Sequence, residues 1–128
     1  MITVLVADDH TVLRDGLRYL LEAQGDIQII GMAANGQEAV DQAIQYCPDV
    51  VVMDISMPVM NGIDATRIIC KSCQNTKVVI LSMHHTAEYM QRAQEAGAQG
   101  YLLKDSAGAE LVTAIRALNH GQLYFSRK

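Results

Sequence analysis

Residues 50–58, Val-Val-Val-Met-Asp-Ile-Ser-Met-Pro, decide the fold class of this chain. The first four form a short apolar run, rich in β-branched side chains, that ends at the carboxylate of Asp54. A run that is apolar on both faces is typical of a strand in a parallel sheet that helices cover on both sides. The sequence therefore predicts a buried central strand with a charged group at its carboxyl end.

Similar apolar runs precede and follow this strand, and stretches with helical periodicity separate them. Strict alternation of strand and helix predicts a single α/β domain with a parallel sheet and right-handed crossovers. The run over 27–33 includes polar and small residues, which favours an edge strand. The predicted strands cover 2–7, 27–33, 50–53, 78–81 and 101–103, and the helices cover 13–21, 40–47, 60–71, 86–96 and 111–118.

The composition is typical of a soluble globular protein of the cytoplasm. The chain has 128 residues, 50% of them hydrophobic and 19% charged, and a formal net charge of −4. No apolar run approaches the roughly 18 residues of a membrane helix, and three cysteines are too few for a disulfide framework. The acidic balance argues against a broad basic face for nucleic acid. We therefore expect residues 1–120 to form one domain and residues 121–128 to form a polar C-terminal extension.

Charged and hydroxyl side chains stand at the ends of four predicted strands. Asp8 and Asp9 follow the first strand, Asp54 the third, Ser82 the fourth and Lys104 the fifth. Parallel strands bring their carboxyl ends to one edge of the sheet, where open α/β sheets place their functional sites. We therefore predict that these side chains meet at one site.

Three clustered carboxylates repel one another and need a compensating cation. Asp8, Asp9 and Asp54 contribute −3 and Lys104 contributes +1, which leaves −2 at the site. Mg²⁺ matches this charge, prefers carboxylate oxygens and often shares its ligands with a phosphoryl group. The pattern therefore favours a Mg²⁺ site at which Asp54 is a nucleophile toward a phosphoryl donor, with Lys104 stabilising the phosphoryl oxygens.

The motifs at these strand ends resemble those of bacterial two-component response-regulator receiver domains. They are Asp8-Asp9-His10, residues 53–58 followed by Asn61-Gly62, Ser82, and residues 101–104. Residues 31–36 and 121–126 further resemble the NarL/LuxR-type subfamily, in which the receiver precedes a helix-turn-helix. The resemblance implies a flavodoxin-like fold, a doubly wound five-stranded parallel sheet of order 2-1-3-4-5 with five flanking helices.

The resemblance also implies a role for each residue of the site. Asp54 would accept a phosphoryl group from the phosphohistidine of a sensor histidine kinase. Asp9, Asp54 and the backbone carbonyl of Ser56 would bind Mg²⁺ directly, and Asp8 would act largely through water. Lys104 would pair with the phosphoryl group. Such a domain is a signalling switch and not a turnover enzyme.

The implied switch consists of two residues. Ser82 would move its hydroxyl onto a phosphoryl oxygen, and Tyr101 would turn inward to fill the space that this vacates. The resemblance suggests that the natural protein continues past Lys128 into a DNA-binding domain, with residues 121–128 beginning the linker, and that phosphorylation drives homodimerisation. DNA would then be bound only through a domain outside this chain.

Two alternative functions stay open at this point. A phosphohydrolase of the haloacid-dehalogenase type also uses an aspartyl nucleophile, although it carries Asp-x-Asp after its first strand, where this chain has Asp8-Asp9. A receiver-like module that signals without phosphorylation would not need the full acidic set. One departure from the receiver pattern is Asp105, since many receivers have proline after the lysine that corresponds to Lys104.

Cysteine and histidine pairs outside this site suggest other chemistry less strongly. Cys70 and Cys73 close a predicted helix, whereas a thioredoxin-like pair opens one. His84 and His85 are adjacent and lack the separation usual for zinc ligands, so we expect exposed loop residues near the site. His10 is expected to start a helix.

Overall fold

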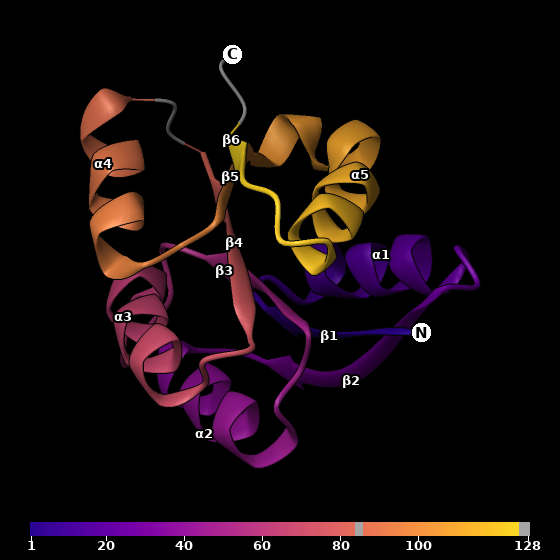
Figure 1. The fold of residues 1–128 in the computed structure, drawn as a ribbon, viewed down its shortest axis with the longest axis horizontal. Helices are drawn as coiled ribbons and strands as arrows, with labels where there is room; N and C mark the ends of the chain where they lie inside the picture. Colours follow the sequence, from indigo (N-terminus) through magenta and orange to yellow (C-terminus); the bar gives the residue numbers. More distant parts are fainter. Residues whose placement is uncertain (84–85, 126–128) are drawn as a thin grey trace.

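The computed structural model describes residues 1–83 and 86–125 (Figure 1). Strands and helices alternate along the chain, as the sequence predicts. The strands are β1 (Ile2–Ala7), β2 (Ile27–Ala33), β3 (Val50–Asp54), β4 (Lys77–Ser82), β5 (Gly100–Leu103) and β6 (Tyr124–Phe125). The helices are α1 (Thr11–Glu22), α2 (Gly36–Tyr46), α3 (Gly62–Ser72), α4 (Ala87–Ala96), the short 3-10 helix η1 (Lys104–Ser106) and α5 (Ala107–Asn119).

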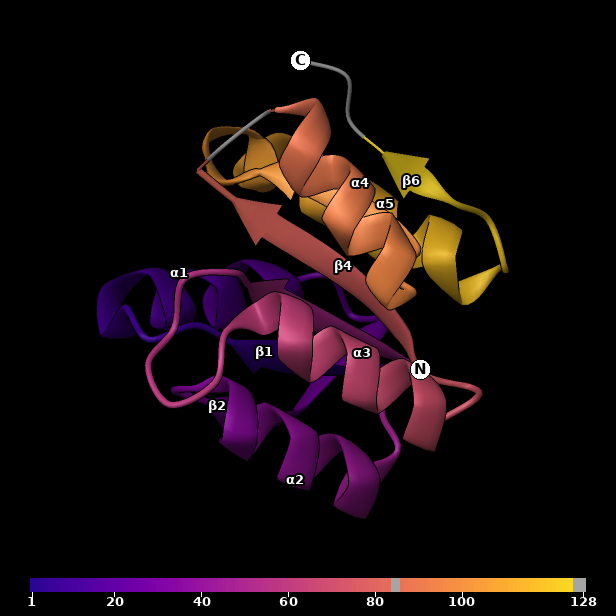
Figure 2. The same cartoon turned by 90° about the vertical axis from the view of Figure 1, so that its left-hand side faces the viewer.

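The strands form one parallel sheet of order β2-β1-β3-β4-β5-β6. The first five confirm the expected order 2-1-3-4-5, and β2 is the edge strand that its polar residues indicate. β3 lies between β1 and β4, and all of its residues are buried. Figures 1 and 2 show α1 and α5 on one face of the sheet and α2, α3 and α4 on the other.

The sheet separates two hydrophobic cores. In the α1/α5 core, Leu21 of α1 and Leu111 of α5 pack with strand residues such as Val52. In the α2/α3/α4 core, residues of those three helices pack with Met53 and Tyr101. Neighbours along a strand point to opposite faces, so consecutive residues of β3 supply different cores. This explains why the run over 50–53 has no polar position.

Side-chain caps set the first residues of α3 and α4. Asn61 accepts a hydrogen bond from the backbone amide of Asp64 (2.9 Å), so α3 begins at Gly62 and not at the predicted residue 60. Thr86 likewise accepts a hydrogen bond from the backbone amide of Tyr89 (3.3 Å), and α4 begins one residue later than predicted. In both cases a polar side chain supplies an acceptor to amides that have none within the helix.

The C-terminal segment contains a short strand that the sequence pattern does not predict. Tyr124 and Phe125 form β6, which pairs with Gly100 and Tyr101 of β5. The backbone amide of Tyr124 donates to the carbonyl oxygen of Gln99 (2.9 Å). Part of the segment expected to be a polar extension therefore belongs to the sheet, which has a sixth strand beside the five expected ones.

Among the helices of the described residues, none combines the length and the hydrophobicity that crossing a membrane requires.

Candidate functional site

The strand ends bring the predicted residues together at one edge of the sheet. Asp8 directly follows β1, Asp54 ends β3, Ser82 ends β4 and Lys104 directly follows β5. The Lys104 ammonium group contacts two carboxylates: its Nζ lies 3.1 Å from Asp54 Oδ1 and 3.5 Å from Asp8 Oδ2. One lysine thus joins acidic groups from two other strands.

Two carboxylates of this cluster are buried together with their cation. Asp8 and Asp54 are only 1% and 2% exposed, and the Lys104 side chain is 9% exposed. Asp9 lies at the rim, with 31% of its side chain exposed. Buried charges are costly unless they are paired. Because Lys104 supplies one positive charge to two buried carboxylates, a negative charge remains inside the site.

The oxygen atoms of the cluster fit a divalent cation. Ligand atoms of Asp8, Asp9, His10 and Asp54 lie within 4.8 Å of one another. Within the part of the chain that the structure describes, Asp8 Oδ2 and Asp54 Oδ2 are buried and have no hydrogen-bond partner. A buried acceptor without a partner is costly, and a cation that such oxygens bind removes this cost. The cluster is therefore consistent with a Mg²⁺ site.

The surroundings of Asp54 disfavour its charged form. Burial raises the pKa of the Asp54 carboxyl above its ordinary value, and the negative charge of Asp8 also raises it. The hydrogen bond and the charge of Lys104 act in the opposite direction, as does the backbone of Ser56. The carboxylate therefore depends on nearby positive charge to stay ionised.

Lys104→Met is expected to lower the free energy of unfolding by about 2 kcal/mol at neutral pH, because it removes a charged hydrogen-bonding partner from buried carboxylates. Loss of Lys104 raises the folded-state pKa of Asp54 further. The deficit should be present above that pKa and shrink as acidification protonates Asp54. Urea unfolding between neutral and mildly acidic pH measures this.

Lys71→Met is the matched control for this substitution. Lys71 is an exposed lysine on α3, and its replacement should change the free energy of unfolding by no more than about 0.5 kcal/mol. A deficit in Lys104→Met that grows on acidification would contradict the assigned role of Lys104.

Close backbone packing shapes the turn after Asp54. The amide of Gly62 donates to the carbonyl oxygen of Ile55 (2.9 Å), and a Cβ atom at Gly62 would overlap the carbonyl oxygen of Asp54. Within the same turn, Val59 has a φ of 69°, which is rare for a β-branched residue. The Asp54 backbone can therefore hold this position only because residue 62 is glycine and has no Cβ atom.

The two residues of the implied switch, Ser82 and Tyr101, are buried and interact. Ser82 is 1% exposed and Tyr101 is 0% exposed. Burial raises the pKa of the Tyr101 phenol, and a hydrogen bond with Ser82 partly offsets this rise. Tyr101 therefore already occupies an inward position in this structure, beside the hydroxyl at the end of β4.

Sequence reasoning missed the contacts by which two residues, His10 and Arg14, brace the end of the first strand. His10 precedes α1, as expected, but its Nδ1 also lies 3.1 Å from Asp8 Oδ1 and 3.2 Å from Asp9 Oδ1. Arg14 Nη1 donates to the carbonyl oxygen of Asp8 (3.0 Å). The available signals were the Asx-turn spacing between Asp8 and His10, and the helical spacing of four residues from His10 to Arg14.

The cysteine pair lies away from this site. Because α3 leads back from the site to the start of β4, Cys70 and Cys73 lie toward the amino ends of the strands, opposite the site. Burial raises the pKa of both thiols, which reduces the thiolate form that redox chemistry requires. The expectation for His84 and His85 falls outside the described residues.

The fold and the site together define an α/β domain with an acidic, lysine-paired pocket at the carboxyl ends of its strands. The chain belongs to the response regulator receiver domain family, whose model matches residues 4–116. Receiver domains act in two-component signalling and are not classical enzymes. The family match therefore excludes the phosphohydrolase alternative.

Several known proteins share this domain. Over 122 residues, the chain is 44% identical to the transcriptional regulatory protein LiaR of Bacillus subtilis, which corresponds to 95% of this chain and 58% of LiaR. The chain thus spans less than two thirds of the length of that relative. A crystal structure of a LuxR-family two-component response regulator from Aurantimonas sp. is 37% identical, with a TM-score of 0.90 over 95% of this chain and 87% of that chain.

A more distant solved structure contains ligands. It is the CheX–CheY complex of Borrelia burgdorferi with BeF₃ and Mg²⁺, and the matching chain of that complex is 26% identical to this chain. The match covers 91% of this chain and 88% of that chain, with a TM-score of 0.85.

Proposed function

We propose that this domain is a phosphorylation switch in which Asp54 accepts a phosphoryl group from the phosphohistidine of a sensor histidine kinase. The observation that carries the proposal is the state of the Asp54 carboxylate. One oxygen is paired with Lys104, and the other is buried without a hydrogen-bond partner. As the bond between histidine nitrogen and phosphorus breaks, a bond forms between phosphorus and a carboxylate oxygen of Asp54.

The other acidic residues provide a binding site for Mg²⁺. In this proposal Asp9, Asp54 and the backbone carbonyl of Ser56 bind the ion directly, and Asp8 acts through water. When bound, Mg²⁺ offsets the negative charge of the phosphoryl oxygens. The buried carboxylate oxygens that lack a hydrogen-bond partner support this site, as does the presence of Mg²⁺ and BeF₃ in the CheX–CheY complex.

Lys104 and the switch residues respond to the new phosphoryl group. The Lys104 ammonium, 3.1 Å from Asp54 Oδ1, is placed to pair with phosphoryl oxygens. Ser82 turns its hydroxyl toward one of these oxygens, and the Tyr101 ring, which is already inward in this structure, takes the space next to β4 that Ser82 leaves. The local change of charge thereby alters the surface around β5.

The output of the switch is the control of transcription. We propose that residues 1–120 are the receiver domain and that residues 121–128, which add β6 to its sheet, lead toward a DNA-binding helix-turn-helix. The protein would act in the cytoplasm and form a homodimer when phosphorylated. The transcriptional role of LiaR, of which this chain matches 58%, supports the proposal.

Acetyl phosphate tests the proposed chemistry without a kinase. Incubation with acetyl phosphate and Mg²⁺ should add one phosphoryl group per chain in intact-mass spectra, and EDTA should prevent the addition. The chain should not turn over p-nitrophenyl phosphate, which serves as the control for hydrolase activity. Absence of labelling at millimolar Mg²⁺ would favour a module that signals without phosphorylation.

A further inference from the structure

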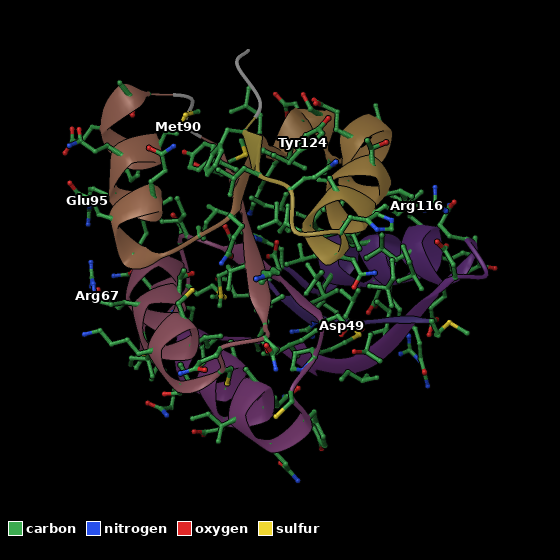
Figure 3. The ribbon with its side chains drawn as sticks, in the orientation of Figure 1. Asp49, Arg67, Met90, Glu95, Arg116 and Tyr124 are labelled. Atoms are coloured by element: carbon green, nitrogen blue, oxygen red, sulfur yellow. The ribbon has the colours of Figure 1, made fainter. Side chains whose placement is uncertain are left out.

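The two side chains of β6 pack on opposite faces of the sheet, beside its edge strand β5. Tyr124 packs with the α1/α5 core, and its Oη donates to Glu110 Oε1 of α5 (2.8 Å). Phe125 packs with the α2/α3/α4 core. Figure 3 shows Tyr124 beside α5, with Met90 on α4 at the other side of β5. These two consecutive residues thus fix β6 to the sheet by packing on both of its faces.

β6 also lies directly beside Tyr101. In the register of the two strands, Phe125 pairs with Tyr101 and Tyr124 pairs with Gly100. Paired residues on adjacent strands point to the same face, and both Phe125 and Tyr101 belong to the α2/α3/α4 core. Gly100 leaves room for this pairing, because a Cβ atom there would lie 3.1 Å from the carbonyl oxygen of Tyr124. Phe125 and Tyr101 therefore lie on neighbouring strands and on the same face of the sheet.

We propose that the docking of β6 on the outer edge of β5 is coupled to the inward position of Tyr101. Coupling between two sites is reciprocal, so whatever favours the inward Tyr101 also favours the docked β6. The extension to signalling rests on the proposed function: a phosphoryl group on Asp54 that draws Ser82 toward it strengthens the docking of β6. β6 is then held more tightly in the phosphorylated state.

Phe125→Ala, compared with Leu123→Ala, tests the coupling in the absence of any phosphoryl donor. Phe125→Ala should accelerate amide hydrogen exchange of residues 122–125 several-fold. In hydroxyl-radical footprinting it should also raise the oxidation of Tyr101 several-fold. Leu123 is 69% exposed, so Leu123→Ala should change neither value. Tyr19, 83% exposed, is the internal reference for oxidation.

Faster exchange of residues 122–125 with unchanged oxidation of Tyr101 would overturn the proposal. Tyr124→Phe is a milder second variant, since it removes the hydrogen bond to Glu110 and keeps the ring. It should raise both readouts by a smaller factor than Phe125→Ala does. An increase in only one of them would also count against the coupling.

Beryllofluoride with Mg²⁺ tests the link to phosphorylation. In the wild-type chain it should slow the exchange of residues 122–125 by about fivefold or more, and in Asp54→Asn it should have no effect. Unchanged exchange in a chain that acetyl phosphate does label would overturn the link. If acetyl phosphate does not label the chain, the proposed function fails, whereas the comparison without a phosphoryl donor still decides whether β6 and Tyr101 are coupled.

Discussion

Asp54→Asn is expected to abolish phosphoryl labelling by acetyl phosphate while leaving the unfolding free energy at least as high as in the wild type. Asparagine keeps the shape of the side chain and an acceptor for Lys104, but it lacks the nucleophilic carboxylate. Because burial and Asp8 raise the pKa of Asp54 in the folded chain, its ionised form weakens the fold. The neutral amide removes that cost.

The pH dependence of stability checks the sign of this effect. The cost of the charged carboxylate is fully present above the raised folded-state pKa, shrinks as pH falls below it, and is gone below the pKa of the unfolded chain. In urea unfolding without Mg²⁺, the Asn variant should therefore exceed the wild type most clearly at neutral pH, and the two should converge on acidification. A growing difference at acidic pH would contradict the raised pKa.

Asp49→Asn is the matched control for Asp54→Asn. Asp49 precedes the same strand at its amino end, where its Oδ2 accepts hydrogen bonds from the backbone amide (2.9 Å) and hydroxyl (3.1 Å) of Thr3. Figure 3 labels this residue. Asp49→Asn should keep full labelling. It should also keep the stabilisation by Mg²⁺, which at a hundred times Kd amounts to about 2.7 kcal/mol and should be much smaller in Asp54→Asn.

Gly62→Ala is expected to lower the free energy of unfolding by about 3 kcal/mol or more, the upper range for overpacked sites. The added methyl group would overlap the carbonyl oxygen of Asp54 and press on the Met53 side chain (2.9 Å from Cγ). Neither neighbour can retreat easily, since Asp54 belongs to the central strand and Met53 is fully buried. Urea unfolding measures the loss, and labelling by acetyl phosphate should fall with it because Asp54 is displaced.

Gly16→Ala controls for the change from glycine to alanine in a helix. Gly16 lies within α1, and a Cβ atom there would meet no atom within 4 Å. Alanine is the better helix former, so this variant should gain about 0.5–1 kcal/mol. If Gly62→Ala were as stable as Gly16→Ala, the close approach of α3 to the Asp54 backbone would not be a real constraint on the fold.

The fold was predictable from sequence because each buried strand needed both faces apolar. The run over 50–53 is the clearest case, since its neighbours in sequence supply different cores. Helix starts were harder to predict because a capping side chain decides them, as at Asn61. β6 could not be predicted from local pattern. Its two residues form a strand only because Gln99, Gly100 and Glu110, distant in sequence, supply partners for them.

The part of the site that could be predicted from sequence is the set of residues at the carboxyl ends of the strands. Parallel strands necessarily collect Asp8, Asp54 and Lys104 at one edge, so their proximity required no knowledge of side-chain conformation. The contacts of His10 and Arg14 were missed because they depend on how α1 leaves β1. The closeness of Gly62 to Asp54 was also hidden, since it arises from the path of the turn between β3 and α3.

The division of the interior by the sheet has a consequence for how this domain can evolve. Ile55 and Met57, in the turn after Asp54, share the α2/α3/α4 core with Tyr101, whereas Leu17 and Leu21 belong to the other core. Substitutions at distant positions without common partners usually have additive effects. Substitutions around Leu17 and Leu21 can therefore change the thermal stability of the domain during adaptation to a new habitat without changing the packing beside Asp54.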